Sequence, residues 1–116
     1  MRNISFFLLL ICFCSCSGLK LKLKNGTDQN FKKVTVAIGN KTYYFDNLRS
    51  GEKTTIITVK GSYHYFPTEI ITENDTITAN AFCYTGEKFY KSGNLVVTLK
   101  IEKSENENFI DFEPSR

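Results

Sequence analysis

The stretch LKLKLK, residues 19–24, alternates leucine with lysine at every position and is followed by the turn-forming pair Asn25-Gly26. Successive side chains on a β-strand point to opposite faces, so this alternation places all three leucines on one face and all three lysines on the other. The pattern therefore predicts a strand with one buried face and one face toward water.

The same two-residue period recurs along the chain, which is rich in the β-branched and aromatic residues that suit a pleated, half-buried surface. Turn-forming residues separate the alternating runs, and Gly39-Asn40 predicts a tight hairpin because it joins two of them directly. No segment has the pattern of an amphipathic helix. The expected strands cover residues 19–24, 33–39, 41–46, 53–60, 67–72, 76–84, 87–91, 95–102 and 108–112.

About eight short strands at this spacing indicate an all-β fold, an antiparallel β-sandwich, with a small barrel as the alternative. Residues 47–54 (NLRSGEKT) resemble the "leucine, two residues, Gly-Glu" corner of immunoglobulin-like envelope domains. The resemblance implies an immunoglobulin-like sandwich in which Leu48 fills the sandwich edge and Gly51 permits the turn. We expect residues 19–116 to form one domain.

The N-terminal segment has the features of an export signal. An apolar run of about ten residues follows Arg2, roughly half of the ~20 residues that a helix needs to cross a bilayer. A short apolar run behind a positive charge is typical of a signal peptide, which is removed from the mature protein.

The end of this segment, Phe13-Cys14-Ser15-Cys16-Ser17, resembles the lipobox of bacterial lipoproteins, in which a small residue precedes the lipidated cysteine. The resemblance implies that residues 1–15 are removed, that Cys16 is acylated, and that residues 16–18 form the lipid anchor and a short tether. Ser17 differs from the Asp that retains some lipoproteins at the inner membrane, which favours the outer membrane. The alternative is a secreted protein cut near Ser17 or Gly18.

The cysteines offer no disulfide to the mature domain. Cys12 and Cys14 leave with the signal segment and Cys16 is acylated, so Cys83 remains alone. Cys83 falls on the same face of its expected strand as small apolar residues, so we expect its side chain in the core. The formal net charge of +3 is too small to indicate a nucleic-acid partner.

Candidate catalytic and metal-binding residues are sparse. His64 is the only histidine, so a histidine pair cannot form, and we expect it in an exposed loop. There is no Gly-x-Ser-x-Gly motif, and no spacing pairs two carboxylates for acid-base chemistry. We therefore predict no metal, no cofactor and no enzymatic activity.

The densest aromatic cluster is a candidate binding patch, because tyrosine is enriched at binding surfaces. The alternative is that about half of its rings fill the core. Its predicted members are Tyr63, His64, Tyr65, Phe66, Tyr84 and Tyr90, and Phe82 and Phe89 are possible additions.

A second candidate surface is the basic stripe of Lys20, Lys22 and Lys24 beside the predicted anchor. Such lysines can attract anionic headgroups. They can also protect an edge strand against unwanted pairing, which is the interpretation that we favour here. The two interpretations are compatible.

From these features we expect a non-catalytic binding or assembly module of the bacterial cell envelope. Its contacts would be the membrane, through lipid on Cys16, and an unknown envelope protein or glycan. One alternative is an inhibitor or immunity-type protein that blocks a toxin or hydrolase. Another is a plain secreted β-sandwich protein.

Overall fold

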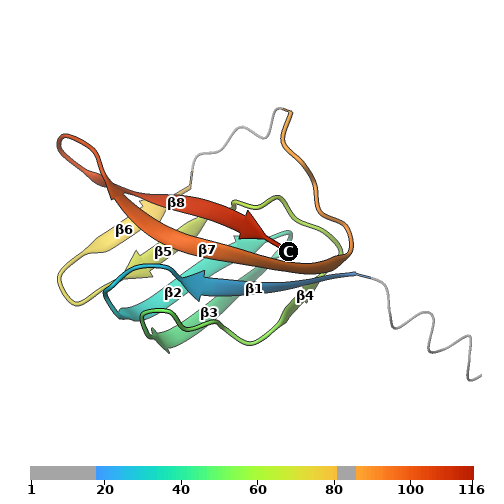
Figure 1. The fold of residues 1–116 in the computed structure, drawn as a ribbon, viewed down its shortest axis with the longest axis horizontal. Helices are drawn as coiled ribbons and strands as arrows, with labels where there is room; N and C mark the ends of the chain where they lie inside the picture. Colours follow the sequence, from blue (N-terminus) through green and yellow to red (C-terminus); the bar gives the residue numbers. More distant parts are fainter. Residues whose placement is uncertain (1–17, 81–85) are drawn as a thin grey trace, which may run out of the picture.

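The computed structural model describes residues 18–80 and 86–116, which form two four-stranded β-sheets (Figure 1). Strand order is β4-β1-β7-β8 in the first sheet and β3-β2-β5-β6 in the second. The predicted all-β sandwich is therefore confirmed. Within the described ranges, no helix is long and apolar enough to cross a membrane. The strands are β1 (Leu19–Asn25), β2 (Phe31–Ile38), β3 (Lys41–Leu48), β4 (Ile57–Val59), β5 (Thr68–Ile71), β6 (Thr76–Ala79), β7 (Gly93–Lys103) and β8 (Asn108–Ser115).

The local patterns of the sequence match the strands that they predict. The three leucines of β1 are fully buried, while the lysines between them are exposed or half-buried. The hairpin at residues 39–40 closes with Ile38 opposite Lys41, and Gly39 adopts a φ of +63°, which glycine accommodates without steric cost. Alternating hydrophobicity thus sets both the strands and their inward faces.

The place of β1 in its sheet corrects one expectation. β1 pairs with β7 in parallel, from Leu19 opposite Gly93 to Asn25 opposite Leu99, and with β4 on its other side. It therefore lies inside the first sheet, and the interpretation of its lysines as protection for an edge strand is wrong. The remaining strand pairs are all antiparallel.

Three expected strands are shorter or absent. The expected strand at 53–60 is reduced to β4, and ahead of β4 the hydroxyl of Thr54 accepts a hydrogen bond from Leu23 N of β1 at 3.1 Å. Residues 87–91 form no strand and contribute one bridge, between Tyr90 and Ser62. β6 ends at Ala79, and residues 81–85, with Cys83, lie outside the described residues, as do residues 1–17.

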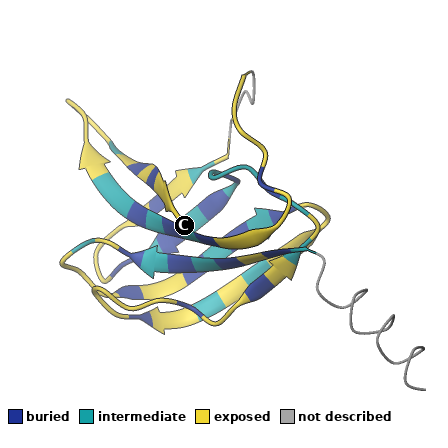
Figure 2. Cartoon of the chain, turned by 45° about the vertical axis from the view of Figure 1, so that its right-hand side comes forward, coloured by how far each residue is buried: buried dark blue, intermediate teal, exposed yellow. Residues whose placement is uncertain are grey.

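The core fills the space between the sheets, and buried positions line the inner side of both (Figure 2). Phe31 is among the largest fully buried side chains, and Leu48, 4% exposed, packs into the core at the end of β3 as predicted. The turn after Leu48 contains Gly51, whose φ of +78° lies in the left-handed region.

The two ends of the sandwich carry different segments. What we call the N-terminal end contains Gly18, which directly precedes β1, with the hairpin at 39–40 and the chain at residues 59–61 and 91–93 (Figure 1). What we call the far end contains the loops at 26–30, 49–53, 72–75 and 104–107. β1 spans the distance between them, about 20 Å at the usual rise per residue.

Candidate binding surfaces

Two long connections meet beside the sandwich and are fixed to each other. The segment at 60–67 follows β4, and the segment at 86–92 precedes β7. Ser62 N donates to Tyr90 O at 2.9 Å, and Tyr90 N donates to Ser62 O at 2.8 Å. Both residues are buried, so this pair of bonds is shielded from water and holds the two segments in register.

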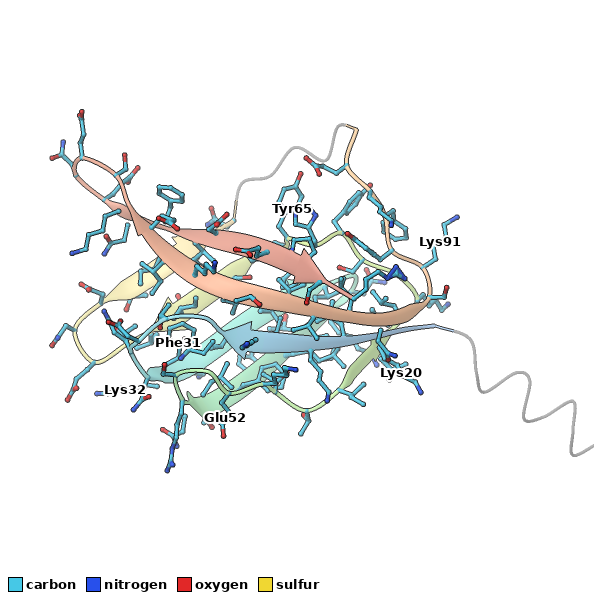
Figure 3. All side chains as sticks on the ribbon, viewed as in Figure 1. Lys20, Phe31, Lys32, Glu52, Tyr65 and Lys91 are labelled. Carbon is cyan, nitrogen blue, oxygen red and sulfur yellow. The ribbon has the colours of Figure 1, made fainter. Side chains whose placement is uncertain are left out.

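Four aromatic side chains from these connections form what we call the aromatic loop surface: Tyr63, His64, Tyr65 and Phe89. The rings of Tyr63 and Phe89 meet edge to face with centroids 5.0 Å apart, and His64 stacks on Tyr65 at 4.8 Å. Phe89 is 45% exposed, and the other three side chains are half-buried. Figure 3 marks Tyr65 on the side of the sandwich where these connections run.

The aromatic loop surface rests directly on the core. Tyr65 contacts the ring of Phe112 edge to face at 6.4 Å, and Phe66 contacts the same ring at 5.7 Å. Beneath Phe89, a Cβ atom placed at Gly61 would lie 2.5 Å from a ring carbon of Phe89. The absence of a side chain at Gly61 therefore makes room for the Phe89 ring.

The structure brings together half of the predicted aromatic patch. Tyr63, His64 and Tyr65 lie together at the surface, although His64 is half-buried and stacked where an exposed loop histidine was expected. Phe66 and Tyr90 belong to the core, which corrects their assignment to a binding patch. Tyr84 and Phe82 lie outside the described residues.

The basic stripe lies on the outward face of the first sheet. Lys20 is exposed and Lys22 and Lys24 are half-buried. On the same sheet, the Lys100 ammonium lies 2.7 Å from the Glu113 carboxylate. The hydrogen bond to Glu113, together with the charge of that carboxylate, raises the pKa of Lys100 above its ordinary value.

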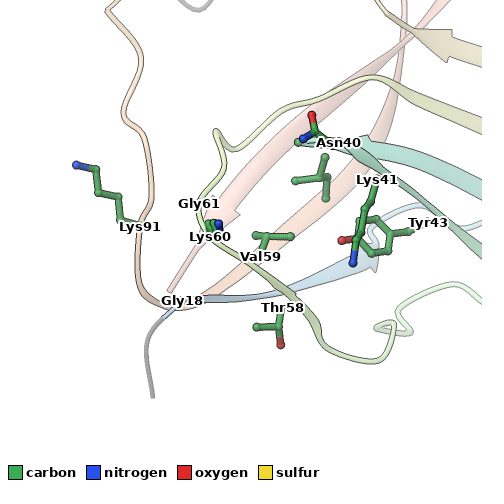
Figure 4. A pocket seen from close by; sticks show the side chains of 11 residues that line it. Gly18, Asn40, Lys41, Tyr43, Thr58, Val59, Lys60, Gly61 and Lys91 are labelled. Carbon is green, nitrogen blue, oxygen red and sulfur yellow. The ribbon is translucent and has the colours of Figure 1, made fainter. Parts of the chain in front are cut away.

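A groove of about 840 Å³ opens at the N-terminal end, lined by residues of β3 and β4, an edge strand of each sheet (Figure 4). Its apolar lining comes mainly from three residues, Ile38, Tyr43 and Val59. Three lysines also line it, and Gly18 lies in the same wall. The lysines are Lys41, Lys60 and Lys91, which sequence analysis missed because they are far apart along the chain and meet only in the fold.

The far end has a hollow of opposite charge. It has a volume of about 540 Å³, and Asp28, Asp75 and Glu102 line it with a single lysine, Lys103. Among residues 18–80 and 86–116, no group of three or more His, Cys, Asp or Glu side chains is placed to hold a metal ion.

Comparisons with protein-family models, with curated proteins and with solved structures gave no significant match for this chain.

Proposed function

We propose that this chain is a lipid-anchored, non-catalytic binding module of the bacterial cell envelope, which holds an envelope protein through the aromatic loop surface. The observation that carries the proposal is this surface itself: four aromatic side chains exposed or half-buried and braced on the core through Phe112. Tyrosine and phenylalanine supply large contact areas with few rotatable bonds, so ordering them on binding costs little entropy.

The surroundings of this surface suit a protein partner. The cationic groups of Lys88 and Arg116 lie 4.9 and 5.3 Å from the centroid of the ring of Tyr90, the residue that follows Phe89 in the chain. An apolar centre with a polar, charged rim is the usual composition of a protein interface. A basic rim favours a partner with acidic residues around its contact site, because complementary charges fix the register of docking.

Anchoring rests on the lipobox-like sequence that ends at Cys16. Gly18, the first described residue, lies at the N-terminal end, and Gly61, next to the aromatic loop surface, lines the same groove as Gly18. A partner bound to this surface would consequently sit close to the membrane.

Site-specific photo-crosslinking in the full chain tests this function. A photoreactive phenylalanine analogue at Phe89 should give one discrete adduct with an envelope protein in living cells, and Tyr63→Ala should abolish it. The matched control is the same analogue at Tyr44, which is 62% exposed on β3 and should give no such adduct. Equal adducts at both positions, or an adduct at Phe89 that survives Tyr63→Ala, would contradict the proposal.

The identity of the crosslinked protein decides between the two binding roles. A structural envelope protein would indicate an assembly module. A toxin or hydrolase whose activity falls when the purified chain is added would indicate an inhibitor or immunity-type protein instead.

A further inference from the structure

We infer that the N-terminal end of the sandwich is a membrane-contact face, on which Lys41, Lys60 and Lys91 bind the phosphates of anionic phospholipids. This inference rests on the proposed membrane anchoring and deepens it, because it specifies how the domain is oriented on the bilayer. The face is defined by the groove beside Gly18 and its three lysines.

The three lysines come from three separate segments and converge on one end of the molecule. Lys41 begins β3, Lys60 follows β4, and Lys91 precedes β7. All three are exposed and line the groove, and Figure 4 shows the Lys91 side chain extending away from the other two. None of the residues that line this groove is an aspartate or a glutamate, so no carboxylate in its lining offsets the positive charge.

The charge at the far end has the opposite sign. Asp28, Asp75 and Glu102 line its hollow, and Glu105 and Glu107 lie in the turn between β7 and β8. Figure 3 marks Lys20 and Lys91 at the N-terminal end, and Glu52 toward the far end near the single labelled lysine there, Lys32. Near an anionic surface, this distribution favours the orientation in which the N-terminal end faces the lipid and the acidic end faces away.

The path of the chain places the same end at the bilayer. Gly18 lines the groove, and Cys16 precedes it by two residues. Two residues span at most about 7 Å, so an acylated Cys16 would hold the groove within reach of the headgroups. The anchor and the lysines therefore act on the same face.

The lining of the groove suits contact with lipid. Tyr43 and Val59 are half-buried and present apolar surface beside the lysines, while Ile38 in the same lining is 4% exposed and belongs to the core. Lysine can lay its apolar stem along such a surface while its ammonium remains in the polar headgroup layer. Tyrosine is likewise suited to an interface that is apolar on one side and wet on the other.

The test uses the mature chain from residue 16 with Cys16→Ser, so that no lipid contributes to binding. Every buried hydrophobic side chain of the described residues lies between Leu19 and Phe112, so this chain keeps the whole described core. Sedimentation with vesicles of phosphatidylcholine containing phosphatidylglycerol should show binding at low salt, and vesicles of phosphatidylcholine alone should show none. Far-ultraviolet circular dichroism verifies that each variant is folded.

Two triple variants with the same change in net charge distinguish binding through the N-terminal end from a general attraction of the positively charged domain to anionic vesicles. Replacing Lys41, Lys60 and Lys91 with Gln should weaken binding to the anionic vesicles about a hundred-fold, since each lysine near the surface contributes roughly a factor of five. Replacing Lys32, Lys53 and Lys103, which are also exposed, should weaken it only a few-fold.

Equal losses in the two triple variants, or equal binding to both kinds of vesicle, would overturn the inference. The proposed function would survive that outcome, because the measurements of lipid on Cys16 and of the crosslink at Phe89 do not depend on these lysines. Conversely, an unlipidated Cys16 in cells would refute the anchoring while leaving the vesicle result in place.

Discussion

The side-chain amide of Asn25, at the end of β1, donates a hydrogen bond of 3.0 Å to the main-chain carbonyl of Leu48, at the end of β3, and thereby joins the two sheets. The same nitrogen donates to Gln29 O at 2.8 Å, and the amide oxygen accepts from Thr27 N at 2.9 Å and from the Thr27 hydroxyl at 2.7 Å. Asn25 is fully buried, so all of these bonds replace bonds to water.

We predict that Asn25→Asp lowers the free energy of unfolding by about 3 kcal/mol, since it turns both bonds that Nδ2 donates into repulsion between oxygens and buries a charge. Urea unfolding at neutral pH measures the loss. The control is Asn94→Asp, at an exposed position of β7, with an expected change within about 0.5 kcal/mol. Similar losses in the two variants would show that the Asn25 contacts do not join the sheets.

The turn between Leu48 and Thr54 should depend on its backbone conformation. Gly51 has a φ of +78° and no atom within 4 Å of an added Cβ, so Gly51→Ala should cost about 1 kcal/mol of unfolding free energy from the backbone alone.

Asn47 has a φ of +54°. Asn47→Gly should leave stability unchanged or raise it slightly, whereas a loss equal to that of Gly51→Ala would contradict the assigned left-handed conformation.

Gly61 and Phe89 should be coupled in a double-mutant cycle. Gly61→Ala alone should displace the Phe89 ring, because the new methyl group would lie 2.5 Å from it, and should weaken the contact between the rings of Tyr63 and Phe89. Nuclear Overhauser effects between those two rings report the displacement. In a Phe89→Ala background the same substitution should cost less stability. Additive losses in thermal unfolding would mean that the two residues do not touch.

The ion pair on the first sheet should be visible by titration. In Glu113→Gln, the pKa of Lys100 should fall back toward its ordinary value, as followed by NMR of the lysine side chain. Because the folded-state pKa is raised, the pair contributes stability that is fully present below the unfolded pKa and is lost as pH rises through the folded pKa. Both groups are well exposed, so the stability change should be small at neutral pH. An unchanged Lys100 pKa would contradict the pairing.

Much of the fold follows from local patterns in the sequence. The leucines of residues 19–23 and the pair Gly39-Asn40 predict a one-faced strand and a hairpin because those signals come from neighbouring residues. The position of β1 within its sheet does not follow, since a central strand with one exposed face alternates just as an edge strand does. Its parallel pairing with β7 joins residues far apart in the chain, which no local pattern reports.

The candidate surfaces show the same difference between features that come from neighbouring residues and features that depend on the fold. Tyr63, His64 and Tyr65 are neighbours in the sequence and were predicted as a group. The sequence does not predict which of the adjacent rings turn inward. The loops that carry Phe66 and Tyr90 lack the two-residue period that fixes side-chain direction in a strand. The three lysines of the N-terminal end are far apart in the chain, and only the arrangement of the strands brings them to one end of the molecule.

The most direct test of the central claim is the intact mass of the protein from a membrane fraction, measured beside a Cys16→Ala variant. We expect the mass of residues 16–116 plus acyl groups, and the loss of that species in the variant. A mass that begins at Ser17 or Gly18 and carries no lipid would contradict the account, since the domain would then be a free secreted protein.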